Sequence, residues 1–151
     1  MVLRVLHLLG QALWIGGALA AMVMALAARQ ETVPVRAAVF RLLARVHSTV
    51  IAPGALVTVL TGLWLTMSLA RQGMGARLGD PGIAAMQALG LLAGLLVLLV
   101  GLPTAAKLAR VADPGPDGTL SPAVERLRRR QAMVSSVAGA LAILALVGAR
   151  W

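Results

Sequence analysis

Two histidines are the residues of this sequence best suited to chemistry, and both lie beside long apolar stretches. His7 begins the segment His7-Leu-Leu-Gly-Gln-Ala-Leu-Trp-Ile-Gly-Gly, whereas His47 follows Arg45 at the start of a second stretch. An imidazole can ligate a metal or transfer a proton. Polar side chains inside a bilayer are costly unless they are paired, so His7 requires either a structural partner or a functional one.

The residues that follow His7 form a pattern when they are placed on a helix. Residues three or four apart lie on the same side of a helix, and in this segment those residues are His7, Gln11, Trp14 and Ala18. Gly10 and Gly17 lie beside this face and are small enough to let a neighbouring helix or a flat ligand come close. Two interpretations of His7 therefore stand: a ligand for a cofactor or substrate, or a buried hydrogen bond to another helix.

The depth of the two histidines in a membrane decides whether they can share one haem iron. His7 lies about 31 Å along a helix from Ala28, and His47 lies about 18 Å from Val35 on the same side of the bilayer, at the helical rise per residue. The difference of about 13 Å is too large for two axial ligands of one iron. For His47, beside Arg45, a structural or lipid-headgroup role is favoured.

The composition is that of a membrane protein. Hydrophobic residues make up 60% of the 151 residues, more than the roughly one half found in soluble domains. The absence of cysteine from the sequence excludes disulfides, thiolate metal sites and cysteine nucleophiles. The formal net charge of +9 does not indicate nucleic-acid binding, because the basic residues lie between apolar stretches, where they meet lipid headgroups first.

All acidic residues lie in the connections between the apolar stretches. They are Glu31, Asp80, Asp113, Asp117 and Glu125. A membrane proton or cation carrier usually places a carboxylate within the bilayer, so that class of protein is not favoured. The apolar stretches also lack the carboxylate pair of a glycoside hydrolase and the acidic member of a catalytic triad.

Four apolar stretches are long enough to cross a bilayer as helices. With short connections between them, they predict an all-α fold, a four-transmembrane-helix bundle of up-down-up-down topology, in one integral membrane domain over residues 1–151. The expected helices cover about 3–28, 37–70, 82–110 and 122–149. The first stretch is longer than the apolar core of a signal peptide, about 7–15 residues, so we interpret it as a helix.

Prolines and small residues indicate where these helices begin, bend and pack. Pro34 falls in the first connection, and Asp80 followed by Pro81 predicts the start of the third helix. Pro53 and Pro103 are expected to kink the second and third helices. Small residues four apart are typical of close helix packing, and they occur at Gly54, Thr58 and Gly62, at Gly90 and Gly94, and at Ser135 and Gly139.

The three tryptophans and the basic residues predict how the chain meets the membrane. Trp14 and Trp64 are expected to fill the bundle, and Trp151 to anchor at the surface. Ten Lys and Arg residues lie in or beside the first and third connections, against four elsewhere, namely Arg4, Arg71, Arg77 and Arg150. The positive-inside rule then places both termini outside the cytoplasm of a multi-pass bacterial inner-membrane protein. The densest basic run is expected to contact anionic lipid headgroups, through Arg126, Arg128, Arg129 and Arg130.

Two segments resemble known membrane families. The segment from His7 to Gly17 resembles the His…Trp-x-Gly-Gly first helix of the HemJ-type and CopD-type proteins. Pro53-Gly-Ala-Leu-Val-Thr-Val-Leu-Thr-Gly-Leu-Trp64 is similar to their second conserved segment. HemJ-type proteins are protoporphyrinogen oxidases that bind haem b, and the resemblance implies that His7 holds the haem. CopD-type proteins are associated with copper uptake, which the resemblance implies as the alternative.

The leading hypothesis is a haem-b membrane redox protein in which His7 alone ligates the iron. The expected cofactor pocket comprises His7, Gly10, Gln11, Trp14, Gly17 and Thr58. The sequence lacks the charged residues that HemJ-type proteins carry late in the first helix and early in the third, so the activity stays open. The alternative is a copper-handling protein with His7, Met22 and Met24 as soft ligands, or a cofactor-free subunit of a membrane complex. We expect the protein to form a homo-oligomer, namely a homodimer, because four short helices leave glycine-lined faces to cover.

Overall fold

A computed structural model describes residues 1–73, 79–113, 115 and 117–148 of the chain. The described part is all helical, without a strand, and contains four helical segments long and apolar enough to cross a membrane: Val2–Gln30, Val33–Arg71, Pro81–Val111 and Pro122–Gly148. The predicted all-α class and the four helices long and apolar enough to cross a membrane are thereby confirmed. The expectations for Arg77, Arg150 and Trp151 lie outside the described residues.

Two of the four segments are continuous helices and two are interrupted. The first is α1 (Val2–Ala27), extended by a short 3₁₀ turn (Ala28–Gln30), and the fourth is α7 (Pro122–Gly148). The second consists of α2 (Val33–Val46), a π-helical segment η2 (His47–Ile51) and α3 (Ala52–Arg71). The third repeats this arrangement as α5 (Pro81–Leu95), a π-helical segment η3 (Leu96–Gly101) and α6 (Leu102–Val111).

The two π-helical segments explain how prolines are accommodated within the second and third spans. Pro53 and Pro103 each occupy the second position of the α-helix that follows a π-helical segment. A proline lacks the N–H that would continue the hydrogen-bond ladder, and a local change to i→i+5 bonding absorbs that loss. The predicted kinks therefore take the form of short stretches with a wider helical turn.

Two helix starts show how well the sequence indicated the boundaries. The second helix begins at Val33, four residues before its predicted start, because Pro34 forms part of its first turn instead of the connection. A proline suits this position, where its missing N–H would have no partner in the helix. The third helix begins as predicted at Pro81, and the Asp80 carboxylate accepts hydrogen bonds from the N–H groups of Gly82 and Ile83.

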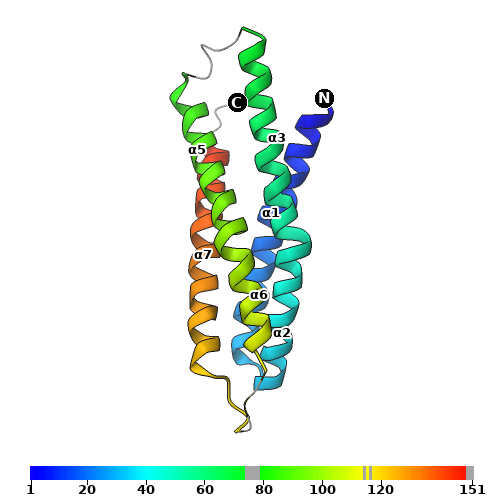
Figure 1. The fold of residues 1–151 in the computed structure, drawn as a ribbon, viewed down its shortest axis with the longest axis vertical. Helices are drawn as coiled ribbons and strands as arrows, with labels where there is room; N and C mark the ends of the chain where they lie inside the picture. Colours follow the sequence, from blue (N-terminus) through cyan, green and yellow to red (C-terminus); the bar gives the residue numbers. More distant parts are fainter. Residues whose placement is uncertain (74–78, 114, 116, 149–151) are drawn as a thin grey trace.

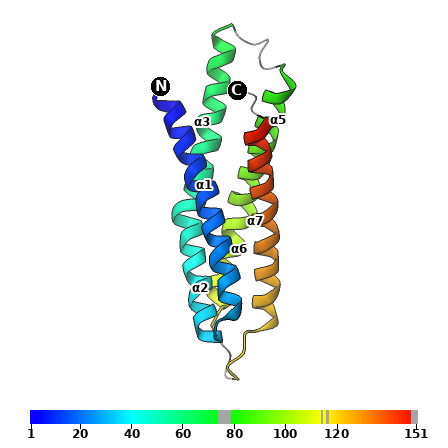
Figure 2. The same ribbon diagram turned by 180° about the vertical axis from the view of Figure 1, so that it is seen from behind.

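The helices are arranged as two pairs that run side by side along the long axis of the molecule (Figure 1). α1 packs mainly against α3, and α5 mainly against α7. Near the lower end of the view, α2 and α6 pack on each other and α6 packs on α7, so the pairs are joined there. Toward the upper end the Gln87 side chain of α5 donates a hydrogen bond of 2.8 Å to the Thr66 hydroxyl of α3. Figure 2 shows the same pairing from behind.

The interior consists of small side chains around one large aromatic residue. Trp14 is 3% exposed and lies in a buried cluster with Ile51, Ala55, Ala93, Val97, Ala138 and Ala142. A second buried cluster joins α2, α6 and α7 at the lower end, and its members are Ala37, Phe40, Leu108, Ala112 and Val124. Trp64 is 55% exposed, so the prediction that it fills the bundle was wrong. It lies on the outer surface among many exposed leucines, which suits contact with lipid acyl chains.

Candidate functional site

His7 lies on α1 and is held by the facing side of α3. Its Nδ1 is 3.0 Å from the Thr58 carbonyl oxygen and 3.0 Å from the Thr61 Oγ1. The ring also lies against Gly62, where a Cβ would come within 3.1 Å of the His7 Cε1. The absence of a side chain at Gly62 therefore gives the imidazole its place between the two helices.

The partners of Nδ1 determine which ring nitrogen carries the hydrogen. The Thr58 carbonyl can only accept, and the Thr61 hydroxyl already donates to the Val57 carbonyl at 2.6 Å. Nδ1–H therefore donates to both oxygens, and in the neutral ring the lone pair lies on Nε2. Histidines that ligate metals are commonly oriented in this way, by a hydrogen bond from the other ring nitrogen to a backbone carbonyl. The structure therefore shows the hydrogen bond to another helix that was one of the two interpretations of His7, and it leaves Nε2 of the half-buried ring as the nitrogen that could bind a metal.

Gly10 and Thr58, both predicted to line a cofactor pocket, meet each other at the crossing of α1 and α3. A Cβ on Gly10 would lie 2.7 Å from the Thr58 Oγ1 and 3.0 Å from the Gly54 carbonyl oxygen. A Cβ on Gly54 would lie 2.8 Å from the Trp14 backbone nitrogen. The two backbones are therefore in direct contact, and the space beside Gly10 is filled by α3.

The other predicted pocket residues are placed in different ways. Gly17 faces η2, because a Cβ there would lie 3.0 Å from the Ile51 Cγ1 and 3.2 Å from the Val50 Cγ1. Trp14 is enclosed in the core, and Gln11 is half-buried. Of the six predicted residues, the structure brings His7, Gly10 and Thr58 together, while Gly10, Trp14, Gly17 and Thr58 pack α1 against its neighbours.

His47 lies at the junction of the two π-helical segments and is almost fully enclosed. Its side chain is 5% exposed, and a Cβ on Gly101 of η3 would lie 2.9 Å from its Nε2. The Gln131 amide of α7 donates to the His47 Nδ1 over a long 3.4 Å. Within the described residues, the His47 Nε2 and the Gln131 Oε1 are buried without a hydrogen-bond partner. His47 is thus buried among the helices, which favours the structural role over the lipid-headgroup role.

The two histidines are far apart in the bundle. His7 contacts Thr58, which lies eleven residues after His47 in the same span, or about 16 Å along the helix axis. One iron cannot bind both rings at this separation. The described part of the chain also holds no group of three or more His, Asp or Glu residues that could surround a metal ion.

The soft ligands of the copper alternative are not brought together. Met22 is 50% exposed and lies fifteen residues after His7 on the straight helix α1, or about 22 Å away. Met24 lies two residues further on, and side chains two apart on a helix do not face each other. A copper site formed by His7, Met22 and Met24 of one chain is therefore wrong.

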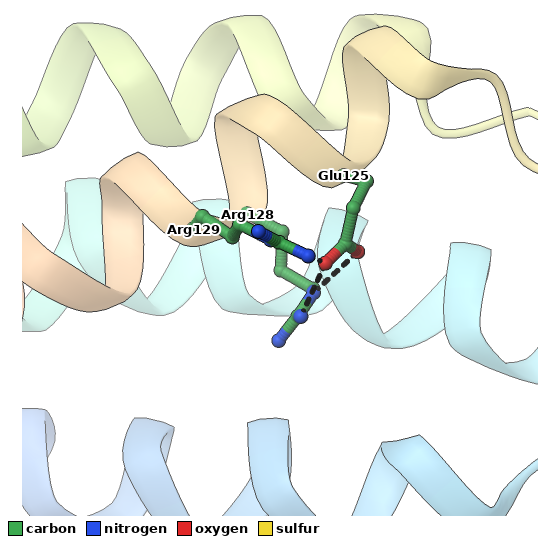
Figure 3. Close-up of polar contacts among 3 residues, drawn as sticks. All are labelled: Glu125, Arg128 and Arg129. Atoms are coloured by element: carbon green, nitrogen blue, oxygen red, sulfur yellow. Dashed lines mark hydrogen bonds and ion pairs between the residues drawn. The ribbon is translucent and has the colours of Figure 1, made fainter.

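The basic run at the start of α7 is partly neutralised within the helix. Figure 3 shows the Glu125 carboxylate in contact with two arginines, Arg128 and Arg129. Arg128 donates to both oxygens, at 2.6 and 2.8 Å, and the Arg129 Nε donates at 3.0 Å. Arg126 and Arg130 are exposed and form no ion pair with a residue that the structure describes. The four arginines are thus not equivalent as candidate lipid contacts.

Three partners of the histidines were missed by reasoning from the sequence. Thr61 and Gly62 lie three and four residues after Thr58, so they face the same helix as Thr58 and form the seat of His7. This spacing is visible in the sequence. Gln131 follows the basic run directly, and its contact with His47, 84 positions away in the chain, has no local signal.

Comparison with known proteins places the chain in a family. No curated protein and no solved structure matches it. One family model, described as "Predicted integral membrane protein (DUF2269)", matches residues 1–150. With four apolar helices and a surface of exposed leucines, this agrees with a protein that crosses the bilayer several times. The chain belongs to the DUF2269 family of integral membrane proteins.

Proposed function

We propose that this protein is a haem-b-binding membrane redox protein in which the His7 Nε2 is the axial ligand. The observation that carries the proposal is the pair of hydrogen bonds from Nδ1 to the Thr58 carbonyl and the Thr61 hydroxyl. They fix the ring and leave Nε2 as the electron-pair donor. The likeness of the first two helices to HemJ-type proteins supports the same role.

The neighbours of His7 would act by positioning it. Thr58 and Thr61 orient the ring, and Gly62 provides the room for it against α3. Gly10 and Gly54 keep the two helices in backbone contact one turn further along, so the ligand is carried by a rigid helix pair.

The part of the His7 ring that α3 does not cover is where a porphyrin would approach. Gly10, Trp14, Gly17 and Thr58 are occupied in helix packing, and Gln11 is half-buried on the same helix as His7. Bound haem would supply one-electron redox chemistry, tuned by its axial ligand. A porphyrin-like or quinone-like substrate dissolved in the bilayer suits a ligand that lies within a membrane span.

The membrane placement that we propose is an up-down-up-down bundle in a bacterial inner membrane, with both termini outside the cytoplasm. It is supported by the lower end of Figure 1, where the chain passes from α1 to α2 and from α6 to α7, because the basic residues concentrate beside these passages. There Arg126, Arg128, Arg129 and Arg130 would meet anionic headgroups, and Arg126 and Arg130 form no ion pair with any residue that the structure describes. A homodimer would cover the open surface beside Gly16, Gly90 and Gly139.

An absorption spectrum of the purified protein tests the haem proposal. We expect a Soret band that is lost in His7→Ala and retained in His47→Ala, because only His7 presents a ring nitrogen outside the packed interior. Added imidazole should restore the band in His7→Ala if the variant is folded, since the free base can replace the missing ligand.

Two results of the same experiment would contradict the haem proposal. A colourless protein after expression with sufficient haem, or a Soret band unchanged in His7→Ala, contradicts it. Copper retained by a colourless protein would favour the copper-handling alternative through a site other than the three residues that the structure separates. A protein with neither group would favour a cofactor-free subunit of a membrane complex.

A further inference from the structure

A hollow of about 220 Å³ lies on the surface of α2, apart from both histidines. It is lined by Ala38, Arg41, Leu42 and Arg45. Residues four apart lie one above the other on a helix, so the hollow has an arginine edge, Arg41 and Arg45, and beside it an aliphatic edge, Ala38 and Leu42.

The hollow faces away from the protein interior. Ala37 and Phe40, on the other side of α2, are buried in the cluster that joins α2 to α6 and α7. Leu42 is 49% exposed, and the Arg41 side chain is 47% exposed. An exposed leucine between two arginines, on the outer side of a membrane-spanning segment, is placed where acyl chains and headgroups meet.

The charges around the hollow leave it positive. Arg41 donates a hydrogen bond of 2.6 Å to Asp113, whose side chain is 76% exposed just beyond the end of α6. Arg45 forms no ion pair with any residue that the structure describes. An exposed pair such as Arg41 with Asp113 is weak, so a phosphate can share or replace the carboxylate. The basic run of α7 differs, since Glu125 already neutralises part of it.

We propose that this hollow binds one anionic phospholipid, with its phosphate between Arg41 and Arg45 and an acyl chain along Ala38 and Leu42. Guanidinium groups bind phosphate oxygens through paired N–H donors. Two such groups one helical turn apart therefore form a defined site for one phosphate. The aliphatic edge selects a lipid over a soluble phosphate, because only a lipid brings a chain that can cover Leu42.

Native mass spectrometry of the purified protein can measure this binding. Phosphatidylglycerol is the anionic probe, and phosphatidylcholine with the same acyl chains is the zwitterionic control. We expect preferential binding of phosphatidylglycerol and a loss of about fivefold in affinity in Arg45→Gln, the effect of one arginine near a membrane surface. Arg110→Gln, an exposed arginine of α6 that neither lines the hollow nor belongs to the basic run of α7, should bind like the wild-type protein.

A second variant separates a lipid from a soluble ligand. Leu42→Ser should weaken binding of phosphatidylglycerol while leaving any binding of glycerol 3-phosphate unchanged, because only the lipid contacts the aliphatic edge. Equal losses in Arg45→Gln and Arg110→Gln would overturn the proposal in favour of diffuse charge attraction. Equal binding of both lipids, or tight binding of glycerol 3-phosphate by the wild-type protein, would overturn it as well.

Discussion

His7 and His47 are both imidazoles within membrane spans, but their surroundings are opposite. The His7 Nδ1 has two well-placed oxygen acceptors, and the half-buried ring is not closed off around Nε2. His47 is 5% exposed, has one long contact to Gln131, and presses its Nε2 against Gly101 without a partner among the described residues. The His7 ring is held by hydrogen bonds, whereas the His47 ring is held by close packing.

This difference supports the proposal that His7, and not His47, is the ligand. A ligand must be oriented on one side and open on the other, and the His7 ring satisfies both conditions. A ring enclosed by backbone and small residues has no room for a metal with its further ligands. Burial alone is therefore a poor guide to function in this bundle, because the more buried histidine is the less available one.

The largest effect is expected from Gly54→Val, which disrupts the backbone contact between α1, which carries His7, and α3, which holds its ring. The new Cβ would lie 2.8 Å from the Trp14 backbone nitrogen and 2.9 Å from the Gly10 carbonyl oxygen, and backbone atoms cannot turn away as a side chain can. We expect a loss of about 3 kcal/mol in the free energy of unfolding, measured in detergent. Gly16→Val is the matched control, since no heavy atom lies within 4 Å of a Cβ there, and it should cost less than about 1 kcal/mol. Equal losses in the two variants would contradict the packing described for α1 and α3.

A smaller effect is expected from Gly101→Ala, which tests the seat of His47. The added Cβ would lie 2.9 Å from the His47 Nε2, so the ring must move at a cost of about 2 kcal/mol. In a His47→Ala background the same glycine substitution should be nearly neutral, because the obstructing ring is gone. Additive losses in the double variant would show that His47 is not held by this contact.

The smallest effect is expected from Thr61→Val, which sharpens the distinction by removing one acceptor of His7 and leaving the Thr58 carbonyl. A loss of about 0.5–1 kcal/mol in unfolding free energy should follow. The His7 ring ¹⁵N resonances should keep Nδ1 as the protonated nitrogen. Thr49→Val is the matched control, because the Thr49 hydroxyl bonds only to the Arg45 carbonyl of its own helix turn. A change of the His7 tautomer in Thr61→Val would mean that the hydroxyl, and not the carbonyl, sets the ring.

Apolar length and helix punctuation could be predicted from the sequence because their causes are local. A run of about 20 apolar residues has few alternatives to a membrane helix, and Asp80 before Pro81 is a complete capping signal. The glycine spacing in α1 and α3 also predicted that neighbouring helices come close to each other. In the structure Gly10 and Gly17 both lie against a neighbouring helix.

Features set by contacts between distant segments could not be predicted in this way. Trp14 and Trp64 have the same side chain, yet one is enclosed by three other spans and the other faces outward. The environment of His47 depends on Gly101 and Gln131, which come from two other spans. The π-helical segments have no compositional mark beyond the prolines that follow them, because a change in hydrogen-bond register leaves the apolar character of a stretch unchanged.

The π-helical segment His47–Ile51 acts as a phase shift between the two halves of its span. An α-helix turns about 100° per residue, so the extra residue that a π turn holds changes the azimuth of everything that follows. If the same residues were wound as a continuous α-helix instead, Thr58 and Gly62 would swing about 100° away from α1. The side of α3 that receives the imidazole is thus determined two to three turns earlier, by the winding of the chain around His47.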